Sequence, residues 1–304
     1  MIFLDNLING LSLGSIYAII ALGYTMVYGI AKMLNFAHGD VIMVGAYIAF
    51  CGLQYWGIPP VLAFLLAMVV CTILGITIEG LAYRPLRQAT SLAVLITAIG
   101  MSYLLQNIAL MIWGANPKSF PTTFINSTSL HLGKINISSA TLITILVSIV
   151  IMVLLTLFTS KTKLGKAMRC VSEDRGAAEL MGINVNRTIS LTFAIGSALD
   201  AIAGILLCSS YPILQPTTGS MPGIKAFTAA VFGGIGSIPG ARLGGVLLGI
   251  IDAAVSESVT QQAPASTAAL TASQRKASSA RVASHASNST SGTSAFAVPT
   301  VSRI

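Results

Sequence analysis

A cluster of polar residues interrupts the first apolar part of the chain, within the segment MLNFAHGDVIMVGAY, residues 33–47. The cluster consists of Asn35, His38, Gly39 and Asp40. Ionisable groups at membrane depth cost about 2.5–3.5 kcal/mol on insertion scales, so they are usually kept for a function. One interpretation is therefore a substrate path, or a hinge between the parts of a broken helix. The other is a turn at the cytoplasmic surface, in which Asn35 or Asp40 caps the following helix.

Two further candidates lie later in the chain. Asp200 stands alone in the apolar run LTFAIGSALDAIAGILL, and we expect it to face the interior of a helix bundle. Its role there is either an anchor between helices or a translocation residue. The stretch GGIGSIPGARLGG, residues 233–245, contains six glycines and a proline, which break a helix. Gly233, Gly234 and Gly236 are either the centre of two half-helices or a short turn at the membrane surface.

No residue pattern predicts catalysis. The chain has no GxSxG, HExxH or paired CxxC, and it has no GxxxxGK[ST] loop for ATP. Its histidines, His38, His131 and His285, are far apart in the sequence. We therefore expect no catalytic residue, no metal site and no cofactor in this chain.

The elements that must position these residues are membrane-spanning helices. Charged residues make up 9% of the chain and apolar residues 54%, whereas soluble domains contain about 25% charged residues. Continuous apolar stretches of about 20 residues recur, which predicts helices and not the alternating strands of a barrel. The fold class is therefore all-α, a polytopic helical membrane protein with about eight transmembrane or half-spanning helices. The net charge of +8 lies in short loops between spans, so we expect no nucleic-acid partner.

The apolar runs and the basic loops predict the topology. The segments 84–90 and 161–187 carry clustered cations and are expected in the cytoplasm, which places 114–139 and the N-terminus outside. Glu79 is expected to pair with Arg84 or to extend to the membrane surface. The predicted spans are 7–30, 40–56, 60–82, 91–113, 140–159 and 188–210, followed by shorter pieces near 225–236 and 241–255.

The composition changes at Ser256, which divides the chain into a membrane domain, 1–255, and a tail, 256–304. Ser, Thr and Ala supply 29 of the last 49 residues. Such a segment buries too little apolar surface to offset the entropy of ordering, so we predict disorder. The apolar pattern also stops without a helix stop signal, and our hypothesis is that a frameshift produced the tail.

The loop 161–187 is the largest polar segment within the membrane domain, with six of the 17 Lys and Arg residues and three of the nine acids. Gly165 to Arg169 is expected to begin a short helix. Glu173, Asp174 and Arg175 then open a second one, Gly176 to Met181, which Gly182 ends. A small apolar face on this helix predicts a docking element, formed by Ala177, Ala178, Leu180 and Met181. The other interpretation is a solvated loop whose cations only set the topology.

Three segments resemble a known family. VSEDRGAAELMGINVNR, residues 171–187, resembles the cytoplasmic coupling segment of branched-chain amino acid ABC transporter permeases. Residues 9–47 resemble the start of the H-type (LIV-H-like) permease, and GIKAFTAAVFGGIGSIPGARLGGVLLGIIDA, residues 223–253, resembles its late region. The resemblance implies that the segment docks on an ATPase through Arg169, Glu173, Asp174, Arg175, Ala177, Ala178, Leu180, Met181 and Gly182.

The resemblance also implies partners and a location. These are a second homologous permease, two cytoplasmic ABC ATPase subunits that use ATP and Mg²⁺, an extracytoplasmic substrate-binding protein and membrane lipid, in a bacterial or archaeal cytoplasmic (inner) membrane. Leu, Ile and Val would then move inward by alternating access. Similar permeases carry urea, short amides or other amino acids. An ion-coupled secondary transporter, with His38, Asp40 and Asp200 as ion sites, and a membrane-embedded enzyme are the alternatives of other classes.

Two features depart from the family pattern. Gly176 stands where a helix former is expected, which weakens the docking helix by up to about 1 kcal/mol. The family normally continues with one more apolar span after Asp252 and a basic end, where this chain has the Ser/Ala/Thr tail.

Overall fold

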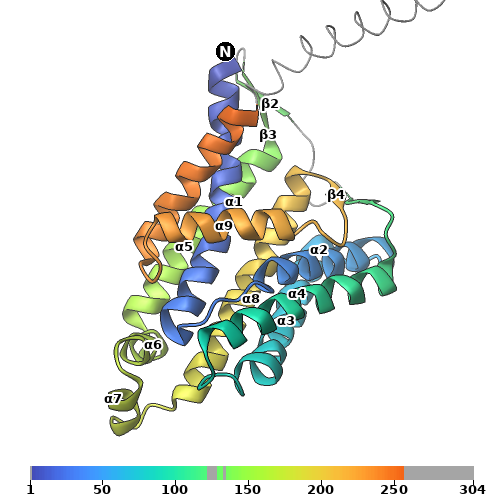
Figure 1. Ribbon diagram of the computed structural model, residues 1–304. Coiled ribbons are helices and arrows are strands. Elements are labelled where there is room, and N and C mark those ends of the chain that lie inside the picture. Colours follow the sequence, from blue (N-terminus) through green and yellow to red (C-terminus); the bar gives the residue numbers. More distant parts are fainter. Residues whose placement is uncertain (1, 122–128, 133–134, 257–304) are drawn as a thin grey trace, which may run out of the picture. The chain divides into compact units, whose positions relative to one another are not determined.

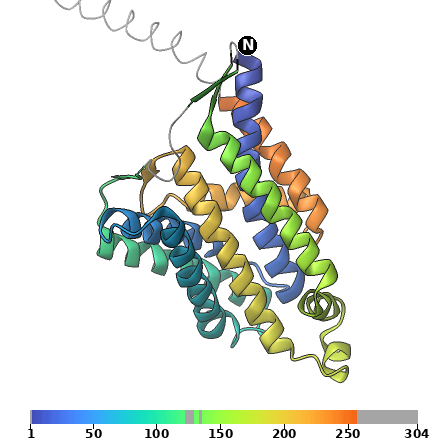
Figure 2. The same ribbon diagram turned by 180° about the vertical axis from the view of Figure 1, so that it is seen from behind.

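Helices make up most of the described part of the chain, which comprises residues 2–121, 129–132 and 135–256 of the computed structural model. Six helices there are long and apolar enough to cross a membrane (Figures 1 and 2). They are α1 (Ile2–Ala31), α3 (Pro60–Ile78) with its π-helical continuation η1 (Glu79–Tyr83), α4 (Ser91–Trp113), α5 (Ser139–Lys161), α8 (Val185–Ser210) and a last helix, Ile238–Ser256.

Two further helices are shorter than the six spans. The helix α2 (His38–Gln54) has 17 residues and α9 (Ser220–Phe232) has 13. At 1.5 Å per residue these are about 26 Å and 20 Å long, and a hydrocarbon core is about 30 Å thick. Together with the six spans, they confirm the predicted fold of about eight transmembrane or half-spanning helices. The predicted tail falls almost wholly on residues 257–304, which lie outside the described part of the chain.

The core lies where α1, α2 and α8 meet. In the most apolar windows of α1 and α8, 89% and 83% of the residues are buried, against 28% or less in the other four spans. The helix α2 is buried along almost its whole length. The outer spans therefore present broad apolar faces, which suits contact with lipid acyl chains or with another membrane protein.

The last helix runs antiparallel to α1 and beside it, as both views show (Figures 1 and 2). Glycines make this approach possible. A Cβ atom on Gly249 would lie 2.1 Å from the Cα of Gly14, and one on Gly245 would lie 2.5 Å from the Cα of Ala18. Small residues at such crossings let helix backbones approach closely.

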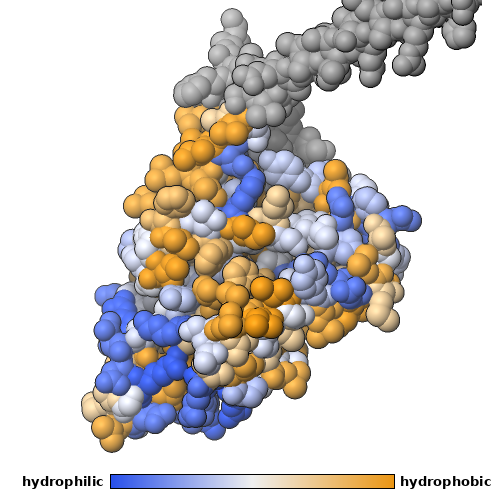
Figure 3. Space-filling view, viewed as in Figure 1, coloured by the Kyte–Doolittle hydropathy of each residue, from blue (hydrophilic) through white to orange (hydrophobic). Residues whose placement is uncertain are grey.

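The two ends of the helix bundle differ in polarity. One end carries α6 (Lys163–Glu173), α7 (Arg175–Leu180) and the loop 84–90. We call it the basic end, and hydrophilic residues gather over it in Figure 3. The opposite end carries the start of α1 and four short strands in two antiparallel pairs. The pairs are β1 (Lys118–Ser119) with β4 (Ile213–Leu214), and β2 (Ser129–Leu132) with β3 (Ile135–Ser138).

This arrangement agrees with the predicted topology, in which 84–90 and 161–187 share one side. One cavity is lined both by Arg87 and Ala89 and by Arg175, so the two segments lie together. The boundaries differ by a few residues. The helix α8 begins at Val185 and not at 188, and α9 begins at Ser220 and not at 225.

Candidate translocation and coupling site

The segment 161–187 folds into two short helices with defined ends. Thr162 caps α6, because its Oγ1 accepts a hydrogen bond of 3.0 Å from the Gly165 amide. Asp174 caps α7, and its Oδ1 accepts from the amides of Gly176 at 2.8 Å and Ala177 at 3.1 Å. Gly182 has φ +79 after the last turn, as a glycine that ends a helix does.

Both helices lie where the sequence predicts them, with two differences. Glu173 is the last residue of α6, so its expected place at the opening of the second helix is wrong. Ala178 was expected on the exposed apolar face and is only 2% exposed, so that placement is also wrong. Leu180 and Met181 are 91% and 82% exposed. The apolar surface offered by α7 therefore consists chiefly of these two side chains at its end.

The two helices contact the spans at two places. The Arg175 guanidinium donates a hydrogen bond to the carbonyl of Ala31, the last residue of α1. Residues of α6, including Arg169 and Glu173, line a cavity of about 320 Å³ together with residues from the end of α1 and with Ile235, Gly236 and Ile238. A displacement of this segment would therefore act on both α1 and the turn before the last helix.

The glycine-rich stretch forms that turn. Gly234 and Gly236 have φ +86 and +96, values that favour glycine. A Cβ atom on Gly240 would lie 1.7 Å from the Gly233 carbonyl oxygen, so only glycine permits this hairpin. Because the turn shares a cavity with α6, it lies at the basic end. The structure therefore favours the interpretation of Gly233, Gly234 and Gly236 as a turn over their interpretation as a break at mid-membrane.

His38 and Asp200, both named from the sequence, meet in the buried core. His38 Nδ1 lies 2.8 Å from Asp200 Oδ2, and both side chains are at most 1% exposed. The other ring nitrogen lies 3.4 Å from the carbonyl oxygen of Ile20. Both ring nitrogens thus face oxygen atoms. The pair joins the first residue of α2 to the middle of α1 and of α8.

Glycine leaves room for the His38 ring in α1. A Cβ atom on Gly23 would lie 2.7 Å from His38 Nε2, and the ring of Tyr24 lies 4.2 Å from the imidazole, centroid to centroid. The segment 32–37 therefore returns from the end of α1 to the middle of that helix. This favours the hinge interpretation of the polar cluster. The capping interpretation is wrong, because the N-cap of α2 is Ala37, with no side-chain cap.

The other polar residues of the cluster have partners that the sequence did not reveal. Gln106 Nε2 donates to Asp40 Oδ1 at 2.9 Å and lies 3.2 Å from the hydroxyl of Ser220, the first residue of α9. The Tyr83 hydroxyl donates to Asn35 Oδ1 at 2.8 Å. The backbones of α2 and α9 also touch here, since a Cβ atom on Gly39 would lie 2.7 Å from the carbonyl oxygen of Gly219. The starts of the two short helices thus meet beside α4.

A further polar group lies nearer the opposite end. Lys225 Nζ contacts both carboxylate oxygens of Asp252 at 2.8 and 2.7 Å, and the Tyr17 hydroxyl lies 3.1 Å from the same carboxylate. Just beyond α8, burial raises the pKa of Tyr211, and the Asp252 carboxylate adds to the effect. Nothing in the spacing of these residues along the sequence marked them as partners.

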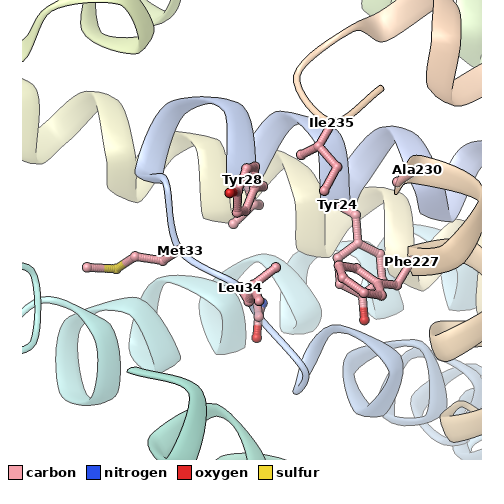
Figure 4. A pocket seen from close by; sticks show the side chains of 9 residues that line it. Tyr24, Tyr28, Met33, Leu34, Phe227, Ala230 and Ile235 are labelled. Carbon is pink, nitrogen blue, oxygen red and sulfur yellow. The ribbon is translucent and has the colours of Figure 1, made fainter. Parts of the chain in front are cut away.

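A small pocket lies between α1, the segment 32–37 and α9 (Figure 4). Its free volume is about 10 Å³, which a single water molecule would fill. In this conformation it therefore has no room for an amino-acid side chain. The aromatic and aliphatic side chains around it are those of Tyr24, Val27, Tyr28, Met33, Leu34, Phe227, Ala230 and Ile235.

Comparison with known proteins decides the family. The sequence profile described as "Branched-chain amino acid transport system / permease component" matches residues 6–272. The chain belongs to this permease family. The branched-chain amino acid transport permease BraD of Pseudomonas aeruginosa is 47% identical to it over 263 residues, which cover 83% of this chain and 85% of BraD.

Other relatives have lower sequence identity to this chain. The permease LivH of Escherichia coli K12, also named for branched-chain amino acid transport, is 44% identical over 262 residues, 83% of this chain and 85% of LivH. The ribose import permease RbsC of Haemophilus influenzae is 27% identical over 261 residues, 83% of this chain and 77% of RbsC. No solved structure matches the chain. The resemblance stated from the sequence is confirmed, and the roles of the individual site residues stay predictions.

Proposed function

We propose that this chain is the membrane-spanning permease subunit of an ATP-binding-cassette importer in the cytoplasmic membrane, and that it moves branched-chain amino acids inward by alternating access. The relatives named for branched-chain amino acid transport support this substrate class, at 44–47% identity. ATP and Mg²⁺ would be used by two separate ABC ATPase subunits. A second homologous permease and an extracytoplasmic binding protein would complete the importer.

The observation that carries this proposal is the end of α7. Leu180 and Met181 are 91% and 82% exposed, in a region that is otherwise hydrophilic (Figure 3). A short helix that presents large apolar side chains fits into a hydrophobic groove of a protein partner. A loop that only sets the topology needs cations, and it has no need of exposed apolar side chains.

The contacts of the segment 161–187 with the spans could transmit a movement of this segment to the core. The Arg175 bond holds α7 to the last residue of α1, from which residues 32–37 lead to His38 in the core. The α6 helix reaches the hairpin that joins α9 to the last helix. Movement of the segment would therefore be transmitted to both short helices, whose starts meet beside α4. Interfaces with two discrete arrangements are the usual basis of such switching.

Uptake in vesicles tests the function and the substrate together. The full chain is produced with its companion subunits and binding protein, and uptake of labelled leucine is measured with and without internal ATP. We expect ATP-dependent uptake that unlabelled isoleucine and valine reduce, while urea and ribose leave it unchanged. If only urea or ribose reduces the uptake, the chain transports a different substrate of the family and the branched-chain assignment is wrong.

The same vesicles distinguish an ion-coupled transporter. If uptake continues without ATP and stops when an ionophore removes the ion gradient, the importer assignment is wrong. The polar residues His38, Asp40 and Asp200 would then be the first candidates for coupling-ion sites.

A further inference from the structure

A basic cavity of about 400 Å³ lies at the basic end, between α1, α4 and α7. Its cations come from three separate segments. Lys32 follows α1, Arg87 lies in the loop before α4, and Arg175 opens α7. No carboxylate lines the cavity, whose other residues are Tyr28, Ala31, Met33, Leu34, Ala89, Ser91, Val94 and Leu95.

Two of the three cations have no carboxylate partner within the described residues. Arg87 is neutralised by the buried Glu79, which it contacts directly, and it also bonds Asn186. Lys32 and Arg175 form no salt bridge among the described side chains. Arg175 gives one donor to the Ala31 carbonyl, and a guanidinium carries five N–H donors. The cavity therefore keeps an excess of positive charge that suits an anion.

The wall of the cavity continues onto an apolar surface. Val94 and Leu95 belong to the first turns of α4, and in the most apolar window of this helix only 17% of the residues are buried. Most of its exposed side chains beyond the cavity are apolar, beginning with Leu92, Ile96 and Ile99, and the exposed polar one is Asn107. A basic cavity at the end of a span, next to an exposed apolar helix face, has the two parts that a phospholipid requires.

We propose that this cavity binds the phosphate headgroup of an anionic phospholipid, whose acyl chains lie along the exposed face of α4. Basic pockets between membrane helices on the cytoplasmic side hold such headgroups. The proposal depends only on the chain's place in a membrane and not on the transported substrate. The phosphate would lie between Lys32, at the end of α1, and Arg175, on α7. A bound lipid would therefore strengthen the link that Arg175 already makes to Ala31.

Lipid titration of the purified full chain tests the proposal. The chain is kept in neutral detergent and titrated with phosphatidylglycerol or with phosphatidylcholine of the same acyl chains, and bound lipid is counted by native mass spectrometry. We expect saturable binding of phosphatidylglycerol and weaker binding of phosphatidylcholine. Lys32→Gln should lower the affinity for phosphatidylglycerol about fivefold, the factor for one basic residue near an anionic surface.

Control substitutions distinguish a loss of the lipid site from a general loss of charge or of folding. Lys161→Gln removes an exposed cation from the end of α5, outside the cavity lining, and should leave the affinity unchanged. Lys32→Arg should retain the affinity, and Arg175→Gln should lower it like Lys32→Gln. Helix content measured by circular dichroism shows whether each variant is folded.

Several outcomes would overturn the proposal. Equal binding of the two lipids, or equal losses in Lys32→Gln and Lys161→Gln, would show nonspecific attraction. Complete displacement of phosphatidylglycerol by an equimolar amount of inorganic phosphate would show an anion site without a lipid. Loss of the bound lipid on assembly with the ATPase subunits would assign the cavity to a protein contact.

Discussion

His38 Nδ1 lies 2.8 Å from Asp200 Oδ2, at the point where α1, α2 and α8 cross. The contact joins the start of the short helix α2 to α8, and the other ring nitrogen faces the Ile20 carbonyl of α1. No water-filled path is needed to explain it, because the two side chains are at most 1% exposed and lie within hydrogen-bonding distance of each other. We therefore interpret the pair, in this conformation, as an anchor between helices.

We predict that removing either partner of this pair is strongly destabilising. Asp200→Leu leaves His38 without its acceptor, and His38→Leu leaves a buried carboxylate without a donor. Breaking a buried pair in this way costs about 3–5 kcal/mol, and replacing both partners with apolar residues costs much less. In detergent, the double variant His38→Leu, Asp200→Leu should therefore have a higher unfolding temperature than either single variant.

The exposed acid Glu179 provides the control, since Glu179→Gln also removes one carboxylate and should not change the unfolding temperature. If the double variant is as unstable as the sum of the single ones, the two side chains do not act as a pair. Normal stability with lost uptake in Asp200→Leu would instead make Asp200 a translocation residue.

A second prediction concerns the packing of α1 against the last helix. In Gly249→Ala the new methyl group would meet the Gly14 backbone at 2.1 Å, which cannot move aside as a side chain does. Overpacking of this kind costs about 1–3 kcal/mol. Gly100→Ala, in α4, meets nothing within 4 Å and should be neutral or stabilising. The unfolding temperature should therefore fall in Gly249→Ala and stay unchanged or rise in Gly100→Ala.

Much of this fold is predictable because a long apolar run in lipid must satisfy its backbone hydrogen bonds internally, as a helix does. The spans and the cap at Gly182 follow from local composition alone. Pairings across the bundle do not, because they depend on which helices meet. Glu79 was expected to pair with Arg84 or to extend to the membrane surface, yet the chain turns after Tyr83 and brings Arg87 to the carboxylate instead. His38 and Asp200 were likewise named separately, and nothing in their spacing made them a pair.

The face of α7 was the least predictable feature. A helix of six residues has no periodic pattern long enough to separate its inner from its outer side. Ala178 therefore looked like part of the docking surface, although it packs against the chain. Only the folded structure shows that Leu180 and Met181 stay exposed at the end of this helix.

A third prediction separates docking from folding at this helix. Ala178→Asp places an uncompensated charge at a buried position, so we expect α7 to unfold locally. Leu180→Asp changes an exposed side chain, so the unfolding temperature should change little. Both variants should lose ATPase stimulation, but only Ala178→Asp should lose hydrogen-exchange protection of the α7 amides. If Leu180→Asp retains co-purification with the ATPase subunits and full stimulation, the docking assignment fails.

The last prediction uses Gly176, the second residue of α7. Glycine in a helix is less favourable than alanine by up to about 1 kcal/mol, and a Cβ atom here would meet only Asp174 Oδ1, at 3.4 Å. Gly176→Ala should therefore strengthen α7 without strain, and it leaves the Asp174 cap in place. Slower hydrogen exchange of the Ala177 and Ala178 amides would measure the gain, with Gly80→Ala, at an exposed site in η1, as a control that leaves α7 unchanged. If the weak helix limits coupling, ATP-dependent uptake should rise in Gly176→Ala. Slower exchange with unchanged uptake would show that α7 is already rigid enough when it is docked.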